Sequence, residues 1–461
     1  MTRNGRFVES LYRRAPSVVQ DLAPRIEQWS KGAWASQKAM IVDAGTLATA
    51  TVVSQGLRIA ILPALSRLYA PAEFGIFQIF MSILGAAGLI STAGYDKAVV
   101  LASSERRAMS VMLVGCLTAV AVATAAWIAM ALSGASVAVA LNSPNLAFFL
   151  FALLPIGILA IGLGENARYY ATRQRRFGMI AKALIAQAIV TATIQAGLGF
   201  FPAIGAGGLI VGRVAGIVLL GGLLWSVSWR PVFTGLREIR WPSLRDSALR
   251  YRKFPMVVTP TTVFSQSVYI GPIFLVAMYF SPEDVGFFGV VMLLLSAPMQ
   301  FVGSAVEQVF YRNATEERLT TGACPTSVKQ AFVLLTVIAG AFGLLLILLA
   351  KPAIAVILGQ NWAAVGDILL WMTPMIVLNL VGMPLQPSFV VMGYQSLQFA
   401  HQAVRSLASV GALWFAAAYT GDLRATVMAY AIMEVAMHSI GILLVFYVSG
   451  IRPSYRKGVS P

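Results

Sequence analysis

Arginine side chains stand inside two of the long apolar stretches of this sequence, where charged groups are rare. Arg58 shares one helical face with Ser54 and Gln55, because at about 100° per residue the three side chains fall within roughly 100° of one another. Arg213 lies in a second apolar stretch, within Gly212-Arg213-Val214-Ala215-Gly216. Charges inside a membrane normally face the bundle interior or a hydrated cavity. We therefore expect both arginines in a cavity; the alternative for Arg58 is that it snorkels to the outer surface.

The chemistry that these groups offer is the binding of an anion. A guanidinium fork can donate two parallel hydrogen bonds to phosphate or carboxylate oxygens. In the second half of the chain, Ser265 and Gln266 stand in a similar stretch with neutral polar neighbours. We expect these two, with Gln55, to offer neutral hydrogen bonds to the ligand of the same cavity.

Acidic residues in or near the apolar stretches are candidates for gating or for ion coupling. Asp96 and Lys97 are adjacent, so they point about 100° apart and need partners elsewhere. Because Glu307 repeats the position of Asp96, we predict one structural latch in each half. Asp43 begins the helix of Arg58, and Glu434 and His438 lie four residues apart on one helical face. These three could couple Na⁺ or H⁺, and a structural pair is the alternative for Glu434 and His438.

The sequence offers no enzyme site. Its only histidines are His401 and His438, too few for a histidine metal centre. No P-loop is present, so we do not expect the chain to be an ATP-driven pump. We predict no metal site, no catalytic residues and no cofactor beyond a coupling ion.

The elements that must position these residues are membrane helices. Of the 461 residues 58% are hydrophobic and 11% charged, and the mean hydropathy is +0.78. A soluble domain has about 25% charged residues. Apolar runs long enough to cross a bilayer begin near residues 41, 76, 109, 146, 178, 203, 255, 286, 329, 365, 402 and 424. We predict an all-α polytopic membrane protein of about twelve transmembrane helices.

Basic residues cluster in alternate loops, which is the pattern of positive cytoplasmic loops. It places both termini in the cytoplasm, and the inner membrane of a bacterium is the simplest location. The net charge of +16 therefore does not indicate nucleic-acid binding. The predicted segments are a basic arm, a first lobe, a basic linker, a second lobe and a tail, at residues 1–39, 40–229, 230–253, 254–449 and 450–461. The arm either contacts membrane lipids or is a solvated tail.

An internal repeat divides the chain into halves. With an offset of 211 positions, one ungapped register matches Val52, Ser54, Gln55, Ile59, Pro71, Gly75 and Phe77 to Val263, Ser265, Gln266, Ile270, Pro282, Gly286 and Phe288. Asp96 meets Glu307 in the same register. We expect two pseudo-symmetric lobes of six helices that face each other.

Two segments carry a resemblance to a known family. Arg67-Leu68-Tyr69-Ala70-Pro71-Ala72-Glu73-Phe74-Gly75 resembles the R-L-Y-x-P-x-x-F-G motif of bacterial polysaccharide-biosynthesis membrane proteins, the lipid-linked oligosaccharide flippases. Tyr95-Asp96-Lys97-Ala98-Val99-Val100-Leu101 is similar to their Y-E-x-A-I-V-L segment, with Asp in place of Glu. The resemblance is clear over about residues 40–180 and architectural beyond.

The resemblance implies the fold of the multidrug/oligosaccharidyl-lipid/polysaccharide exporter superfamily and alternating access. It implies an undecaprenyl-pyrophosphate-linked glycan as substrate, for exopolysaccharide, capsule or O-antigen synthesis, beside polymerase and glycosyltransferase machinery. A multidrug exporter and a peptidoglycan-precursor flippase of the same superfamily are the alternatives. A membrane-bound glycan polymerase should have a large outer loop, and the outer loops here are short.

Overall fold

The computed structural model describes residues 45–236 and 241–450, and in these ranges the chain is helical without a strand. The first half contains a helix at 45–60, then α3 (Leu62–Leu68), α4 (Pro71–Ile90), α5 (Tyr95–Leu101), α6 (Glu105–Ala140), α7 (Leu146–Ala152), α8 (Leu154–Arg173), α9 (Phe177–Gly199), η1 (Pro202–Ile204) and α10 (Ala206–Leu236). After α11 (Trp241–Arg250), the second half contains η2 (Phe254–Val258), α12 (Thr259–Tyr279), α13 (Pro282–Pro298), η3 (Met299–Gly303), α14 (Ser304–Thr321), α15 (Pro325–Ile357), η4 (Gln360–Trp362), α16 (Ala363–Gly382), η5 (Met383–Leu385), α17 (Pro387–Met392), α18 (Gln395–Thr420) and α19 (Leu423–Val448).

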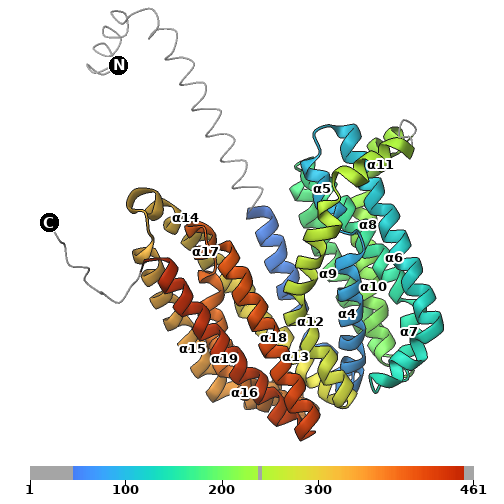
Figure 1. Ribbon diagram of the computed structural model, residues 1–461. Coiled ribbons are helices and arrows are strands. Elements are labelled where there is room, and N and C mark those ends of the chain that lie inside the picture. The colour runs from blue at the N-terminus through green and yellow to red at the C-terminus, as the bar shows by residue number, and fades with distance from the viewer. Residues whose placement is uncertain (1–44, 237–240, 451–461) are drawn as a thin grey trace, which may run out of the picture.

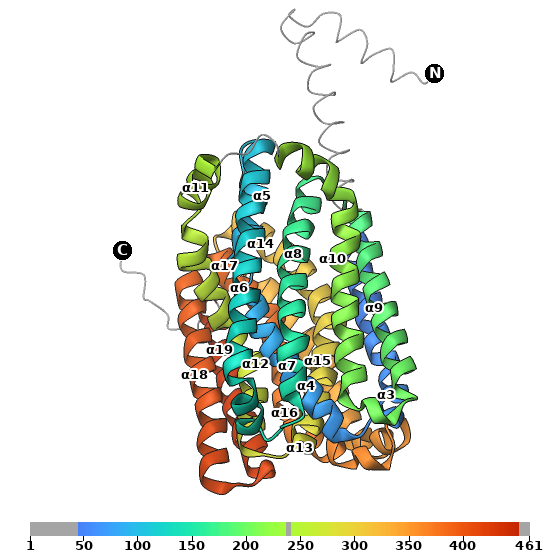
Figure 2. The ribbon, with the colours of Figure 1, turned by 90° about the vertical axis from the view of Figure 1, so that its right-hand side faces the viewer.

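The helices are numerous and long enough for a polytopic membrane protein. Eight segments of the described chain are long and apolar enough to cross a bilayer. Two bent pairs, α7 with α8 and Phe254–Ser267 with Ile270–Tyr279, raise this number to 10 if each pair is one span. The helices α13 and α18 of the second half are not among these candidate spans. The helical architecture with 8 to 10 candidate spans agrees with the fold class predicted from the sequence. Figure 2 shows the long helices of both halves running along one common axis.

The two halves form bundles that meet at one end of the molecule and diverge toward the other (Figure 1). The hydrophobic core follows the same division. Its largest cluster contains residues of both halves, for example Phe74, Ile158, Phe288 and Trp362. A second cluster around Val99 belongs to the first half, and a third around Phe310 belongs to the second. We call the end where the core is shared the joined end.

The repeated Pro-x-x-x-Gly sequence begins equivalent helices in the two halves. α4 and α13 both start with proline, whose missing N–H costs nothing at a first helical position. In each helix, an acidic side chain three residues after the N-cap accepts a hydrogen bond from the backbone N–H of the N-cap residue. Ala70 donates to Glu73 at 2.7 Å, and Ser281 donates to Asp284 at 3.2 Å. Glu73 and Asp284 are also 211 positions apart, so the repeat includes the caps.

The glycines of this motif let α4 and α13 cross in direct backbone contact. A Cβ added at Gly75 would lie 1.7 Å from the carbonyl oxygen of Pro282, and one added at Gly286 would lie 2.0 Å from that of Pro71. The contact is reciprocal, because each glycine packs on the proline of the other copy. The two copies of the repeated sequence therefore contact each other across the pseudo-twofold axis that relates the halves.

Further contacts between the halves close the joined end. The indole N–H of Trp362 donates to the carbonyl of Ser66 at 2.9 Å, and its ring packs edge-on against Phe74 at 4.9 Å. The Asn142 amide lies 3.3 Å from the carbonyl of Phe280, just beyond the end of α12. The acceptors are carbonyls at helix ends, which have no partner within their own helix. Each of these bonds therefore connects a helix end of one half to a side chain of the other half.

We expect Gly75→Ala to force α4 and α13 apart, because nothing at the crossing can yield except backbone. Overpacking of this kind costs about 1–3 kcal/mol, which a thermal unfolding curve of the detergent-purified protein would show as a lower midpoint. Gly85→Ala on the same helix is the matched control, since its new Cβ would approach no atom closer than 3.8 Å. A Gly75→Ala protein as stable as the Gly85→Ala protein would contradict the reciprocal crossing.

Candidate functional site

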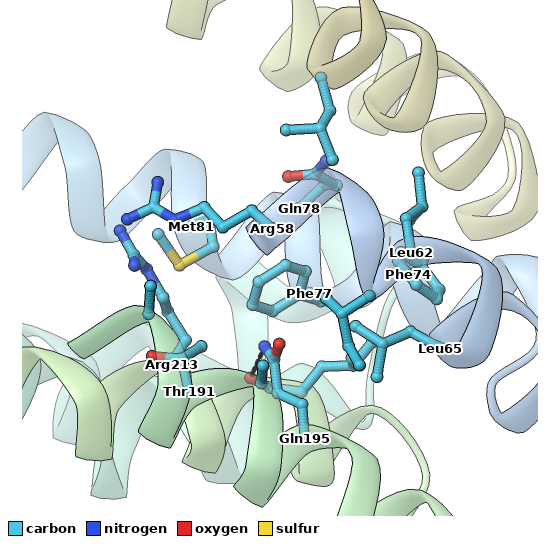
Figure 3. Close-up of a pocket in the computed structure, with 15 residues that line it drawn as sticks. Arg58, Leu62, Leu65, Phe74, Phe77, Gln78, Met81, Thr191, Gln195 and Arg213 are labelled. Carbon is cyan, nitrogen blue, oxygen red and sulfur yellow. Dashed lines mark hydrogen bonds between the residues drawn. The ribbon is translucent and has the colours of Figure 1, made fainter. Parts of the chain in front are cut away.

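A pocket of about 190 Å³ lies in the first half, lined by residues of 45–68, α4, α9 and α10 and by Leu293 of α13. Most of its wall is apolar, with aromatic rings from Phe74 and Phe77 (Figure 3). Its polar lining consists of Arg58, Gln78, Thr191, Gln195 and Arg213. None of the lining residues is acidic, so the pocket carries only positive charge.

Arg58 and Arg213 come from the first and last long helices of the first half, and their guanidinium groups lie beside each other at one end of the pocket (Figure 3). Among the described residues, the hydrogen-bond partner of Arg58 is the side-chain oxygen of Gln55, at a long 3.5 Å. Two adjacent cations without a countercharge repel each other in a medium of low polarity. An anion between them would remove this repulsion and could accept hydrogen bonds from both forks.

Small residues bring Arg213 to this position. A Cβ added at Gly212 would lie 2.6 Å from the Gln195 side chain, and one added at Gly216 would lie 2.0 Å from the Thr191 hydroxyl. α10 therefore packs closely on α9, as small-residue stripes allow in membranes. The turn between these glycines presents Arg213 to the pocket.

Three polar lining residues were not among the candidates from the sequence: Gln78, Thr191 and Gln195. The Gln195 amide donates to the carbonyl of Leu209 at 2.8 Å, and its backbone carbonyl accepts from Tyr69 at 2.7 Å. Gln195 thus fixes the pocket wall. Thr191 and Gln195 lie four residues apart, and this spacing is the only sequence signal that could have selected them.

Other predicted cavity residues lie outside this pocket. Ser54 is buried and donates to the carbonyl of Ala50 at 2.7 Å. Ser265 and Gln266 are exposed on α12, and Ser265 donates to the carbonyl of Thr262 at 2.9 Å. Of the predicted cavity set, the structure brings together Arg58 and Arg213, with Gln55 touching Arg58. Asp43 lies outside the described residues.

The predicted latch residues have different surroundings in the two halves. Asp96 is buried and accepts from the Thr92 hydroxyl at 2.7 Å; burial raises the pKa of Asp96, and this hydrogen bond opposes the increase. The Lys97 ammonium donates to the Thr262 hydroxyl of α12 at 3.2 Å, so its side chain contacts another helix. Glu307 is exposed on α14.

Glu434 and His438 belong to a buried cluster inside the second half. Arg405, from α18, donates to Glu434 at 2.7 Å, and Ser409 donates to the other carboxylate oxygen at 2.5 Å. His438 Nε2 lies 3.3 Å from Glu434 and 3.1 Å from the Asn379 amide. Both oxygens of the carboxylate are therefore engaged by protein groups. Arg405 was not a candidate, because its partner Glu434 lies 29 positions away on another helix.

A metal centre is not formed by the described residues, because no three of their His, Cys, Asp or Glu side chains gather at one point. The arrangement with a distinct chemical capacity is the positive pocket, which can hold an anion of about the size of a phosphate group.

Comparison with solved structures identifies the fold. An inward-facing multidrug resistance transporter of the MATE family, from the MOP superfamily, matches with a TM-score of 0.64 at 14% identity, covering 90% of this chain and 99% of its own. The lipid II flippase MurJ in an inward closed conformation matches with a TM-score of 0.65 at 14% identity, covering 87% and 86%. Identities this low establish the fold alone.

At the sequence level, no curated protein matches the chain. A family model described as polysaccharide biosynthesis protein matches residues 64–367, which is more than half of the chain. The matched region includes the Pro-x-x-x-Gly motif of both halves and Arg213. The chain therefore belongs to the polysaccharide biosynthesis protein family, as a multi-pass membrane protein with the exporter fold.

Proposed function

We propose that the protein is a flippase that moves an undecaprenyl-pyrophosphate-linked oligosaccharide across the bacterial inner membrane, for exopolysaccharide, capsule or O-antigen synthesis. The observation that carries the proposal is the pocket in which Arg58 and Arg213 lie together without an acidic residue. A pyrophosphate is the part of such a substrate that needs fixed cations inside the membrane. Polymerase and glycosyltransferase partners belong to the same proposal.

The pocket takes only the pyrophosphate in this proposal. About 190 Å³ is too little for an oligosaccharide, so the sugars extend beyond the pocket. The joined end is closed by the α4–α13 crossing and by Trp362. With the basic loops on the cytoplasmic side, this end faces outward and the site is reached from the cytoplasm. Both termini are then cytoplasmic.

The same pocket weighs against a multidrug exporter. A pump for organic cations needs acidic groups at the depth of its site, and none lines this pocket. A peptidoglycan-precursor flippase also handles a pyrophosphate, so the pocket is compatible with it. Whether loss of the gene is lethal separates these two flippases.

We expect Arg58→Ala and Arg213→Ala each to weaken substrate binding about ten- to hundredfold. Each variant loses the charge-assisted hydrogen bonds of one guanidinium group, and these bonds contribute about that much to affinity. Surface polysaccharide, measured in a strain that carries only the variant, should fall to near background while immunoblots show normal membrane levels. Arg58→Lys should retain part of the output, because the charge remains and the fork is lost.

Arg312→Gln is the matched control, since Arg312 is exposed on α14 and pairs with Glu316 four residues on. Normal polysaccharide output from both pocket variants would refute the proposed site.

For the coupling ion, we propose that Glu434 and His438 hold the second half together and that Na⁺ or H⁺ is not bound at Glu434. Both carboxylate oxygens already accept from Arg405 and Ser409, which leaves no free oxygen for a cation.

Glu434→Gln should then destabilise the protein by about 3–5 kcal/mol, because it leaves the charge of Arg405 buried without its carboxylate. Thermal unfolding in detergent measures this, and the double variant Arg405→Gln/Glu434→Gln should recover part of the loss. A Glu434→Gln protein that keeps full stability but no longer responds to a Na⁺ or H⁺ gradient in liposomes would instead make Glu434 the coupling site.

A further inference from the structure

An apolar groove of about 420 Å³ lies in the second half, between α13, η3, α15 and α16. Every residue of its wall is apolar; α13 contributes Leu294 and Leu295, η3 contributes Phe301, and α15 contributes Phe342 and Ala353. The groove therefore has no group that would hydrogen-bond a lipid headgroup or a sugar. It suits a hydrocarbon chain.

Local sequence explains why a groove forms here. Pro298 ends α13, and the next five residues, Met299–Gly303, form a π-helical segment with wider turns. On the facing helix, Ala350 and Ala353 line the groove among larger side chains such as Leu346, Leu349 and Ile354. A widened helix opposite two short side chains leaves space that the chain itself does not fill.

The groove is adjacent to the positive pocket through a single helix. Leu293 of α13 lines the pocket, and the next two residues, Leu294 and Leu295, line the groove. Successive helical residues point about 100° apart, so α13 has one face toward each space. A helix is about 10 Å across, and a flexible lipid can pass that distance from one face to the other.

We propose that this groove holds the polyprenyl tail of the lipid-linked substrate while its pyrophosphate lies between Arg58 and Arg213. The inference rests on the proposed function. A polyprenyl chain cannot follow its charged head into the pocket, and it must leave along a neighbouring apolar surface. The groove is such a surface beside the pocket, and it is apolar throughout.

In this proposal, the main role of the groove is to orient the lipid-linked substrate. Lipid tails are as apolar as leucine, so moving the polyprenyl chain from bilayer to groove gains no hydrophobic free energy. The gain comes from van der Waals contacts, each small and together considerable. A chain held along α13 keeps its head beside the pocket.

The test compares two probes in lipid nanodiscs: undecaprenyl pyrophosphate, whose tail can fill the groove, and geranyl pyrophosphate, whose tail is too short. Ala353→Phe fills the groove and should weaken binding of the long probe about tenfold, through loss of packing contacts, without changing binding of the short probe. Ala341→Phe is the matched control, on an exposed face of the same helix. Arg58→Ala should weaken binding of both probes.

The outcomes separate the two proposals. Equal binding of the long probe by the wild type, Ala353→Phe and Ala341→Phe would overturn the groove proposal and leave the proposed function standing. So would an equal loss of both probes in Ala353→Phe, or a groove that is labelled by a photoreactive phosphatidylglycerol and not protected by undecaprenyl pyrophosphate. A wild-type protein that binds neither probe would overturn the proposed function itself.

Discussion

The crossing of α4 and α13 is the contact on which the arrangement of the other helices depends. At Gly75 and Gly286 the two backbones touch, and each helix begins at a proline that the other helix covers. Backbone contact at this closeness has only one geometry, because no side chain remains that could adjust. The crossing therefore fixes which faces of α4 and α13 turn toward the first half and which toward the second.

The two spaces of interest are consequences of this geometry. α4 sends Phe74, Phe77 and Gln78 to the wall of the positive pocket, and α13 adds Leu293. The opposite side of α13 forms one wall of the apolar groove. A charged compartment and an apolar one are thus separated by one helix, in a protein whose proposed substrate is charged at one end and apolar at the other.

Sequence reasoning worked where the information is local or periodic. The 211-residue repeat predicted two matching halves, and its glycines and prolines proved to be the contact between them. Helical periodicity selected Arg58, and the small-residue context selected Arg213. Ser265 and Gln266 match Ser54 and Gln55 in register, and they lie outside the positive pocket on a helix that bends by 55° between Ser267 and Ile270. Arg405 was missed because its role depends on Glu434, 29 positions away on another helix. Periodicity along one helix carries no information about such a partner.

The same residue type therefore has opposite electrostatic consequences in the two halves. Arg405 is neutralised by a carboxylate and is part of the fold, whereas no carboxylate lines the pocket of Arg58 and Arg213. Both pocket arginines belong to the first half, so a rocking motion between the halves does not separate them. The site would stay assembled while the second half moves across it, and accessibility would change by opening contacts such as that between Trp362 and Ser66. An anion site built within one half can thus keep its charge geometry in both orientations, which is what the movement of a charged headgroup through a membrane requires.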